Sequence, residues 1–361
     1  MLEEDLAALD VQTGGHDGVR GLLSLWGWDI PDHWELSDQV FADLDEATGG
    51  VRWWGTQLDQ QKRRLIGDFL FDATSEVTAS LIETKVHLSS YVRATNDEES
   101  RLRFAPVGGG RMYANPQTPV EHLDQRRMGQ ELTGIFRGAG SVLDALAMVI
   151  IGVTSAPIDL RKAGWRHIKD FDLPEPLAGR LDVQAAVAAA GPPGWLGWTL
   201  EMRNALVHRP RPLKLLYVRP FYEPEGAKLL AFLPRNPGDS FVESFARAKR
   251  MNDAMLGEDA RQTVAGIATS IVALIRELSP QLLDVWQWRR DNPDALPQPE
   301  RQWSTAPPQP TGFDGYTAGE GIPQKPEVGL MLAPATARRL QVAAASDDAR
   351  QRVWGGWPPR P

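Results

Sequence analysis

The sequence contains no cysteine, and only six of its 361 residues are histidine. The absence of cysteine excludes disulfides, thiolate metal sites and cysteine nucleophiles. Neither a His-Glu-x-x-His pattern nor a Gly-x-Ser-x-Gly elbow occurs, which excludes the usual zinc-protease and α/β-hydrolase sites. Gly108-Gly109-Gly110 lacks the Lys-Ser/Thr pair that completes a phosphate-binding loop. We therefore expect neither a metal ion nor a cofactor.

Long apolar runs are also scarce. The most apolar stretch, residues 142–153, contains Asp144, and it is shorter than the roughly 20 residues that a membrane-spanning helix needs. The N-terminal segment MLEEDLAALD is acidic, without the basic and then apolar pattern of a secretory signal. These features predict a cytoplasmic protein with no membrane segment, in which residues 142–153 form part of a buried helix.

The charge is acidic overall, with a formal net charge of −8. The field of such a chain repels nucleic acid, so any nucleic-acid function has to come from a local basic site. Hydrophobic residues make up 42% of the chain and charged residues 24%, which is typical of a globular protein.

Composition predicts three parts of the chain. Residues 1–58 are rich in tryptophan and poor in periodicity, which predicts an irregular N-terminal extension with one or two short helices. Residues 59–291 carry apolar residues at helical spacing and predict a helical domain. Residues 292–361 are rich in Pro, Gln, Gly and Ala and predict an extended tail. Within the tail, residues 333–352 can form a helix, and the two final tryptophans are expected to anchor on a protein surface.

The predicted fold class is mainly α, an antiparallel helical bundle with a small β-hairpin insertion. Helices are expected over residues 59–93, 120–153, 159–169, 177–190, 195–209 and 258–288. A polar connection that contains Gly and Pro is expected from Asn96 to Pro119. Two short apolar runs around Glu223-Pro224-Glu225-Gly226 predict the hairpin at residues 213–233. Gly134, Gly138 and Gly140 weaken the second helix but permit close approach of another one.

The most chemically specific segment is Arg203-Asn204-Ala205-Leu206-Val207-His208. It lies on a predicted helix that follows a Gly-Pro-Pro-Gly break and ends before Pro210, because the residue before proline disfavours the helical region. Its buried stripe is expected to be Trp195, Thr199, Met202 and Leu206. Asn204 and His208 share another face, whereas Arg203 and His208 diverge by about 140°. A second copy of the helix across a two-fold axis can close such a site.

A local basic zone surrounds this segment. Between Met202 and Tyr222 the chain has no acidic residue and five basic ones, a pattern that neutralises phosphates. These are Arg203, Arg209, Arg211, Lys214 and Arg219.

An arginine, a polar residue, and a histidine at the end of a helix together resemble the Arg-x(4–6)-His signature of the HEPN superfamily (higher eukaryotes and prokaryotes nucleotide-binding domains). The resemblance covers roughly residues 59–290, with the hairpin as an insertion before the last helix. Many members are metal-independent endoribonucleases that act as dimers in toxin–antitoxin or phage-defence systems. The resemblance implies an RNA substrate, a homodimer, and an antitoxin or defence-system partner.

The resemblance also implies a role for each motif residue. His208 serves as the acid/base or positions the 2′-hydroxyl, Arg203 stabilises the phosphorane-like transition state, and Asn204 orients the pair or the RNA. Histidine titrates near neutrality, and a guanidinium offers paired donors to phosphate oxygens. Arg209, Arg211, Lys214 and Arg219 are expected to bind the RNA backbone.

An alternative to a catalytic site remains open from the sequence. Arg203 can pair with Glu201 or another acid while His208 caps a helix C-terminus, which would make the protein a non-catalytic helical interaction module. His87 lies four residues after Glu83 and four before Tyr91, and we expect it to form a surface or interface pair, not a metal site.

Overall fold

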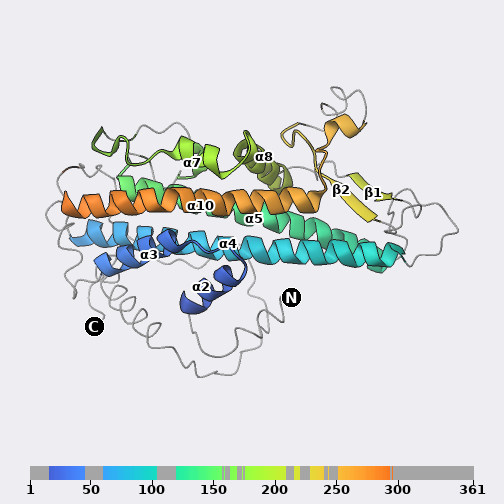
Figure 1. The fold of residues 1–361 in the computed structure, drawn as a ribbon, viewed down its shortest axis with the longest axis horizontal. Coiled ribbons are helices and arrows are strands. Elements are labelled where there is room, and N and C mark those ends of the chain that lie inside the picture. Colours follow the sequence, from blue (N-terminus) through green and yellow to red (C-terminus); the bar gives the residue numbers. More distant parts are fainter. Residues whose placement is uncertain are drawn as a thin grey trace, which may run out of the picture. The chain divides into compact units, whose positions relative to one another are not determined.

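The protein is mainly helical in the computed structural model (Figure 1). The structure describes residues 16–44, 60–103, 119–156, 158, 163–168, 173, 175–208, 215–219, 228–239, 243, 251–292 and 295. The described residues divide into two compact units: one contains residues 16–29, 41–44 and 60–68, and the other contains residues 30–40 and the described part of 69–296. The predicted helix at 333–352 and the final tryptophans lie outside the described residues.

Along the described chain, the helices and strands are α2 (His16–Leu25), α3 (Pro31–Leu44), α4 (Gln60–Arg103), α5 (Pro119–Thr154), α6 (Trp165–Ile168), the short 3-10 helix η4 (Glu175–Leu177), α7 (Val183–Ala190), α8 (Trp195–His208), β1 (Leu215–Arg219), β2 (Lys228–Phe232), the 3-10 helix η5 (Met251–Ala254) and α10 (Ala260–Asp291).

In the smaller unit, α2 ends at a glycine. Gly27 has φ +71°, a conformation that costs glycine little. The backbone N–H groups of Gly27 and Trp28 donate to the carbonyls of Ser24 and Leu23 at 2.9 and 2.8 Å. This arrangement is a Schellman cap, which satisfies the last carbonyls of a helix.

In the larger unit, α4 and α5 are antiparallel and touch through glycines of α5. Gly134 lies against His87, Gly138 against Thr84, and Gly152 against Leu70. The partner's number falls as the glycine's number rises, so the two helices run in opposite directions. The prediction that Gly134, Gly138 and Gly140 admit close helix packing is confirmed, with Gly140 facing α8 instead of α4.

The last helix, α10, runs beside α5 and is antiparallel to α4. Near its start Arg261 bonds to Glu99 of α4, and near its end Arg289 donates to the carbonyls of Gly152 and Val153 at 3.0 and 2.6 Å. The buried Arg289 thus caps the C-terminus of α5, where a positive charge is favourable. Pro280 lies inside α10 without ending it.

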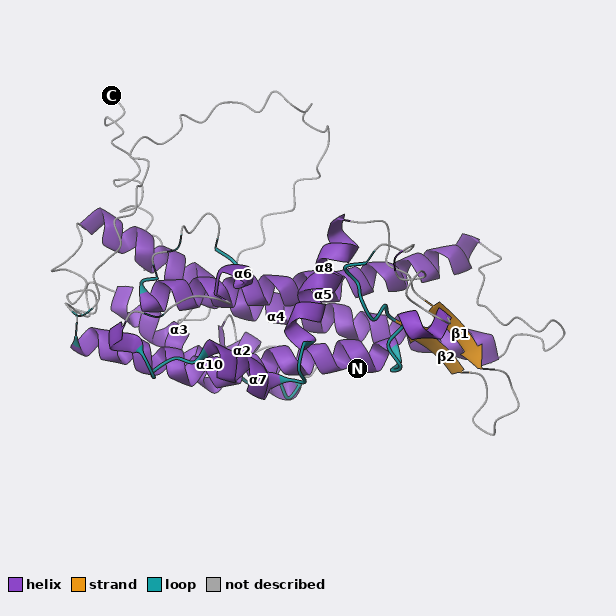
Figure 2. Ribbon diagram, turned by 90° about the horizontal axis from the view of Figure 1, so that it is seen from above, coloured by secondary structure: helices purple, strands orange, loops and turns teal. Residues whose placement is uncertain are grey.

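The β-hairpin is confirmed as a two-stranded antiparallel pair with Leu215 opposite Phe232 and Arg219 opposite Lys228. Figures 1 and 2 both place it at the end of the long helices where α4 ends and α10 begins.

The helix predicted at residues 59–93 is longer than expected. The predicted start of the polar connection at Asn96 is wrong, because α4 continues to Arg103. Residues 104–118 of the predicted connection lie outside the described residues. Asn96 and Glu99 both bond to Arg261 of α10, and such tertiary contacts override weak helix propensity.

Two shorter predictions also need correction. The helix expected over 177–190 begins only at Val183, because Gly179 has φ +81° and Asp182 acts as the N-cap, accepting from the backbone N–H of Ala185 at 2.9 Å. Of the helix expected over 159–169, the structure describes Trp165–Ile168 as helical.

Two stretches of described helix, Arg126–Thr154 and Ala260–Asp291, are long and apolar enough to cross a membrane by length and composition alone. In their most apolar windows 78% and 56% of the residues are buried inside the structure. The buried core helix of a protein has the same length and composition, so these two stretches are only weak evidence for a membrane span.

Candidate functional site

The motif helix α8 forms after a sharp turn and buries one face. Gly194 has φ +85° just before the helix, and Trp198 N–H donates to its carbonyl at 3.0 Å. Trp195, Thr199 and Met202 are buried as the sequence predicts. The fourth predicted position, Leu206, is only half-buried, and Ala205 is buried in its place.

Tryptophans fix α8 to its neighbours. Trp198 packs edge-to-face on Phe136 of α5 with ring centroids 5.7 Å apart, and its Nε1 donates to the carbonyl of Pro234 after β2 at 3.1 Å. Trp195 donates through Nε1 to the carbonyl of Val187 in α7 at 3.1 Å. The helix that carries the motif is therefore held from three directions.

Arg203 lies across a glycine of α5. A β-carbon at position 140 would be only 3.1 Å from Nε of Arg203, so Gly140 leaves the space that the arginine fills. One guanidinium nitrogen, Nη1, donates to Oδ1 of Asn204 at 3.3 Å. Within the part of the chain that the structure describes, the buried Nε has no hydrogen-bond partner.

The acid nearest Arg203 is Asp144 of α5, whose Oδ2 lies 3.9 Å from Nη2. The other carboxylate oxygen, Oδ1, accepts a hydrogen bond from the backbone N–H of Trp165 at 3.1 Å. Glu201, the acid suggested by the sequence, is exposed and lies near Gly238. Sequence reasoning noted Asp144 but gave it no role; its isolation within an apolar run was the available signal.

The remaining motif residues are placed only in part. Asn204 is exposed, and α8 ends at His208. The side chain of His208 lies outside the described part of the structure, and so do all atoms of Arg209, Arg211 and Lys214. The backbone of Arg219 is described and ends β1. The structure thus brings together Arg203, Asn204 and Asp144. That Arg203 and His208 act in one site stays a prediction.

The exposed face of α5 beside Arg203 carries a further cation. Arg137 is exposed and Ser141 is half-buried, and at 100° per residue both share a face with Asp144. Arg137 lies one turn before Gly140, and residues three apart on a helix are neighbours. Arg137 therefore lies on the same face of α5 as Asp144, one turn before Gly140.

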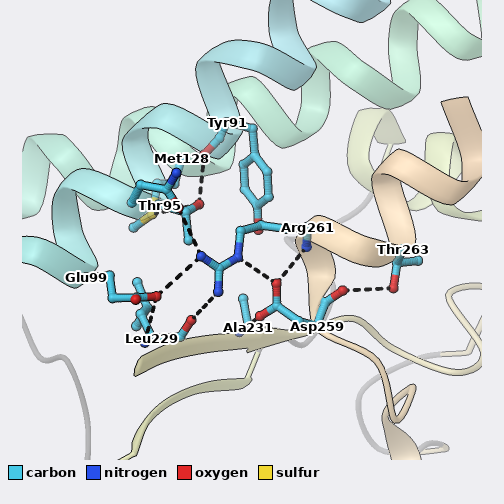
Figure 3. A network of polar contacts seen from close by, with 10 residues as sticks. Tyr91, Thr95, Glu99, Met128, Leu229, Ala231, Asp259, Arg261 and Thr263 are labelled. Carbon is cyan, nitrogen blue, oxygen red and sulfur yellow. Dashed lines mark hydrogen bonds and ion pairs between the residues drawn. The ribbon is translucent and has the colours of Figure 1, made fainter. Parts of the chain in front are cut away.

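A separate polar network surrounds Arg261 (Figure 3). Arg261 contacts Asp259 through Nε at 2.8 Å and Glu99 through Nη1 at 3.3 Å. Burial, together with the nearby charge of Asp259, raises the pKa of the adjacent Tyr91 hydroxyl.

This network closes one edge of β2. Arg261 Nη2 donates to the carbonyl of Leu229 at 3.1 Å, while the N–H groups of Leu229 and Ala231 donate to Glu99 and Asp259 at 3.4 and 3.0 Å. Unpaired strand edges invite pairing with other chains, and here side chains of α4 and of the start of α10 occupy this edge. We interpret the network as the anchor of the hairpin, not as a reaction centre.

Two histidines outside the motif, His87 and His33, make contacts that join helices of the fold. His87 Nδ1 lies 2.8 Å from Oε2 of Glu131, which joins α4 to α5. Glu83, the acid that the sequence places four residues earlier, has Oε1 at 3.8 Å from Nε2 of His87. His33 is fully buried, with Nε2 3.0 Å from the carbonyl of Thr74. Burial lowers the pKa of His33 to about 4, although the bond to Thr74 opposes this shift. Among the described residues, no group of three His, Asp or Glu side chains is arranged to hold a metal ion.

Comparison with known proteins leaves the chemistry of the site as the guide to function. No family model matches this chain, and neither a curated protein nor a solved structure matches it.

Proposed function

We propose that this protein is a HEPN-type, metal-independent endoribonuclease that cleaves RNA as a homodimer. The observation that carries the proposal is the state of Arg203. Its guanidinium is fixed over Gly140, yet it makes one long hydrogen bond, at 3.3 Å to Asn204, and one distant ionic contact, at 3.9 Å to Asp144. Most of its donors are therefore available to a phosphate, five residues before a histidine at the end of the same helix.

The order of elements supports the same family. An antiparallel pair, α4 and α5, precedes the motif helix α8, and the long helix α10 follows it. The hairpin of β1 and β2 is an insertion between α8 and α10.

The proposed reaction uses the RNA's own 2′-hydroxyl as the nucleophile. His208 removes the proton from that hydroxyl or donates one to the departing 5′-oxygen, a role suited to a group that titrates near neutrality. Arg203 stabilises the negative charge on the non-bridging oxygens of the phosphorane-like transition state. Asn204, four residues before His208, orients the RNA or the pair. The products are a 2′,3′-cyclic phosphate and a 5′-hydroxyl.

The exposed face of α8 supports assembly with a second copy. Leu196, Leu200 and Val207 lie in one stripe with Arg203 by helical spacing, and Val207 is 48% exposed. Pairing of this stripe across a two-fold axis, the commonest symmetry of oligomers, covers the apolar residues and brings two motifs together. Arg203 and His208 point about 140° apart on one helix, and in such a dimer the Arg203 of one copy can act with the His208 of the other.

The RNA backbone is proposed to follow the basic residues near the motif. Arg137 shares a face of α5 with Asp144, which contacts Arg203. Arg209, Arg211, Lys214 and Arg219 follow Arg203 along the chain. Local cations of this kind offset the repulsion from a net charge of −8. A cytoplasmic toxin or phage-defence effector, held by an antitoxin or another defence protein, is the biological setting that we propose.

The proposal is tested by cleavage of a mixed-sequence RNA oligonucleotide in the presence of EDTA. We expect cleavage that leaves 2′,3′-cyclic phosphate ends, and a loss of about 100-fold or more in Arg203→Ala, the scale typical of a lost transition-state donor. Arg93→Ala removes an exposed arginine of α4 and serves as the matched control. Cleavage that disappears in EDTA, or an Arg203→Ala variant that is as active as the control, contradicts the mechanism.

One observation favours a second candidate function. Arg203 does face an acid, Asp144, as expected if the motif helix is only structural. In that case the protein is a helical interaction module, and the Arg203→Ala variant changes stability or partner binding without any RNA cleavage to lose.

A further inference from the structure

We infer that Asp144 is a positioning residue that aims the guanidinium of Arg203 and couples it to α6. The inference rests on the proposed function, because it assigns a role within the same site. It goes beyond the Arg-Asn-His motif, since Asp144 lies on a different helix.

The carboxylate of Asp144 is engaged on both sides. Oδ1 accepts from Trp165 N–H at 3.1 Å, and Oδ2 faces Nη2 of Arg203 at 3.9 Å. The hydrogen bond to a backbone group fixes the carboxylate plane, so the oxygen that faces Arg203 is also fixed. One hydrogen bond, from α6, and one ionic contact, with α8, therefore restrain the orientation of the aspartate.

Glycines make room for both side chains of this pair. A β-carbon at position 164 would be 2.9 Å from Oδ1 of Asp144, and one at position 140 would be 3.1 Å from Nε of Arg203. Side chains at these positions would displace the carboxylate and the guanidinium. The pair therefore occupies space that the backbone leaves open for it.

The geometry indicates that Asp144 orients the guanidinium of Arg203 and does not block it with a close ion pair. A distance of 3.9 Å is too long for a hydrogen bond, so Asp144 attracts Nη2 without occupying its donors. Asn204 holds Nη1 at 3.3 Å, so the two contacts restrain the two ends of the guanidinium. The side chains of Arg203 and Asp144 are 34% and 39% exposed, which leaves the group open to a phosphate.

Asp144→Asn isolates the charge. The amide oxygen of asparagine can still accept the bond from Trp165 N–H, while its NH₂ group replaces the oxygen that attracts Arg203. Glu201→Gln is the matched control, since it removes an exposed carboxylate two residues before Arg203. Asp144→Glu returns the negative charge.

The experiment has two readouts on the full-length protein. The first is the ¹H–¹⁵Nε resonance of Arg203, assigned with Arg203→Lys, which reports the guanidinium without any RNA. The second is kcat and KM for a fluorophore–quencher RNA oligonucleotide of mixed sequence, measured with the thermal midpoint. For Asp144→Asn we expect a shifted Arg203 resonance and a kcat lower by about fivefold, the scale of a part-exposed ion pair. KM and the thermal midpoint stay within about twofold and 2 °C of wild type, Asp144→Glu recovers part of kcat, and Glu201→Gln matches wild type.

Other outcomes overturn the inference. An unshifted Arg203 resonance shows that Asp144 does not hold the guanidinium. A fall in kcat that only follows a fall in thermal midpoint shows that Asp144 is structural. If the wild-type protein cleaves no RNA, the proposed function fails, and the Arg203 resonance alone then decides whether Asp144 positions the arginine.

Discussion

Gly138 of α5 lies directly against Thr84 of α4, so that a β-carbon at position 138 would be 3.1 Å from the Thr84 backbone nitrogen and 2.5 Å from its Oγ1. The backbone nitrogen belongs to a helix and cannot move aside like the end of a flexible side chain. The close approach of α4 and α5 at this point therefore requires a glycine at position 138.

Gly138→Ala should therefore destabilise the protein although alanine is the better helix former. We expect the free energy of unfolding to fall by about 1–3 kcal/mol, the usual range for overpacking, measured by urea denaturation. Gly266→Ala is the control, because a β-carbon there meets nothing within 4 Å; it should stabilise α10 by about 0.5–1 kcal/mol. Equal effects of the two substitutions would show that α4 and α5 do not pack as described.

The buried His33 predicts a loss of stability in acid. Its pKa is about 4 in the folded protein and 6.5 as an unperturbed group. The unfolded chain therefore takes up a proton below pH 6.5 while the folded protein resists it until about pH 4. The stabilising contribution is complete above pH 6.5 and is lost as the pH falls to about 4, a change on the order of 3 kcal/mol.

The measurement compares wild type with His33→Gln, whose amide N–H can still donate to the carbonyl of Thr74. We expect the free energy of unfolding of the variant to depend less steeply on pH between 6.5 and 4. Parallel pH curves for the two proteins would mean that His33 is not a buried neutral group.

Much of the larger unit follows from local patterns in the sequence. The α5 helix, the hairpin and the start of α8 are predicted from helical spacing, from a polar four-residue break and from the Gly-Pro-Pro-Gly turn. These signals are local, because a turn or an amphipathic stripe is encoded by neighbouring residues.

The site is less accessible to sequence reasoning. Its contact between Asp144 and Arg203 depends on how α8 docks on α5, and the bond from Trp165 depends on how α6 returns to the same helix. The extension of α4 to Arg103 has the same origin, since Arg261 of α10 engages Asn96 and Glu99. Contacts between residues far apart in the chain leave no repeating pattern in a single sequence, so they could not be predicted from it.

The apolar stripe of α8 predicts how the dimer can be separated. Val207→Asp places a charge at a 48% exposed position, so the fold should tolerate it, whereas a helix–helix interface should not. We expect light scattering to report a dimer for wild type at micromolar concentration and a monomer for the variant, with unchanged circular dichroism. Wild type that is monomeric at that concentration, or a variant that remains dimeric, argues against an α8 interface.

The most direct test of the account is the rate of RNA cleavage by His208→Ala at neutral pH in EDTA. General acid–base help is worth about 10²–10⁴-fold, so we expect a loss of that size with the helical circular dichroism unchanged. His87→Gln is the control, because it alters a half-exposed histidine that pairs with Glu131 between α4 and α5, and it should cleave like wild type. A His208→Ala protein that is folded and cleaves RNA at the wild-type rate would contradict the proposed function.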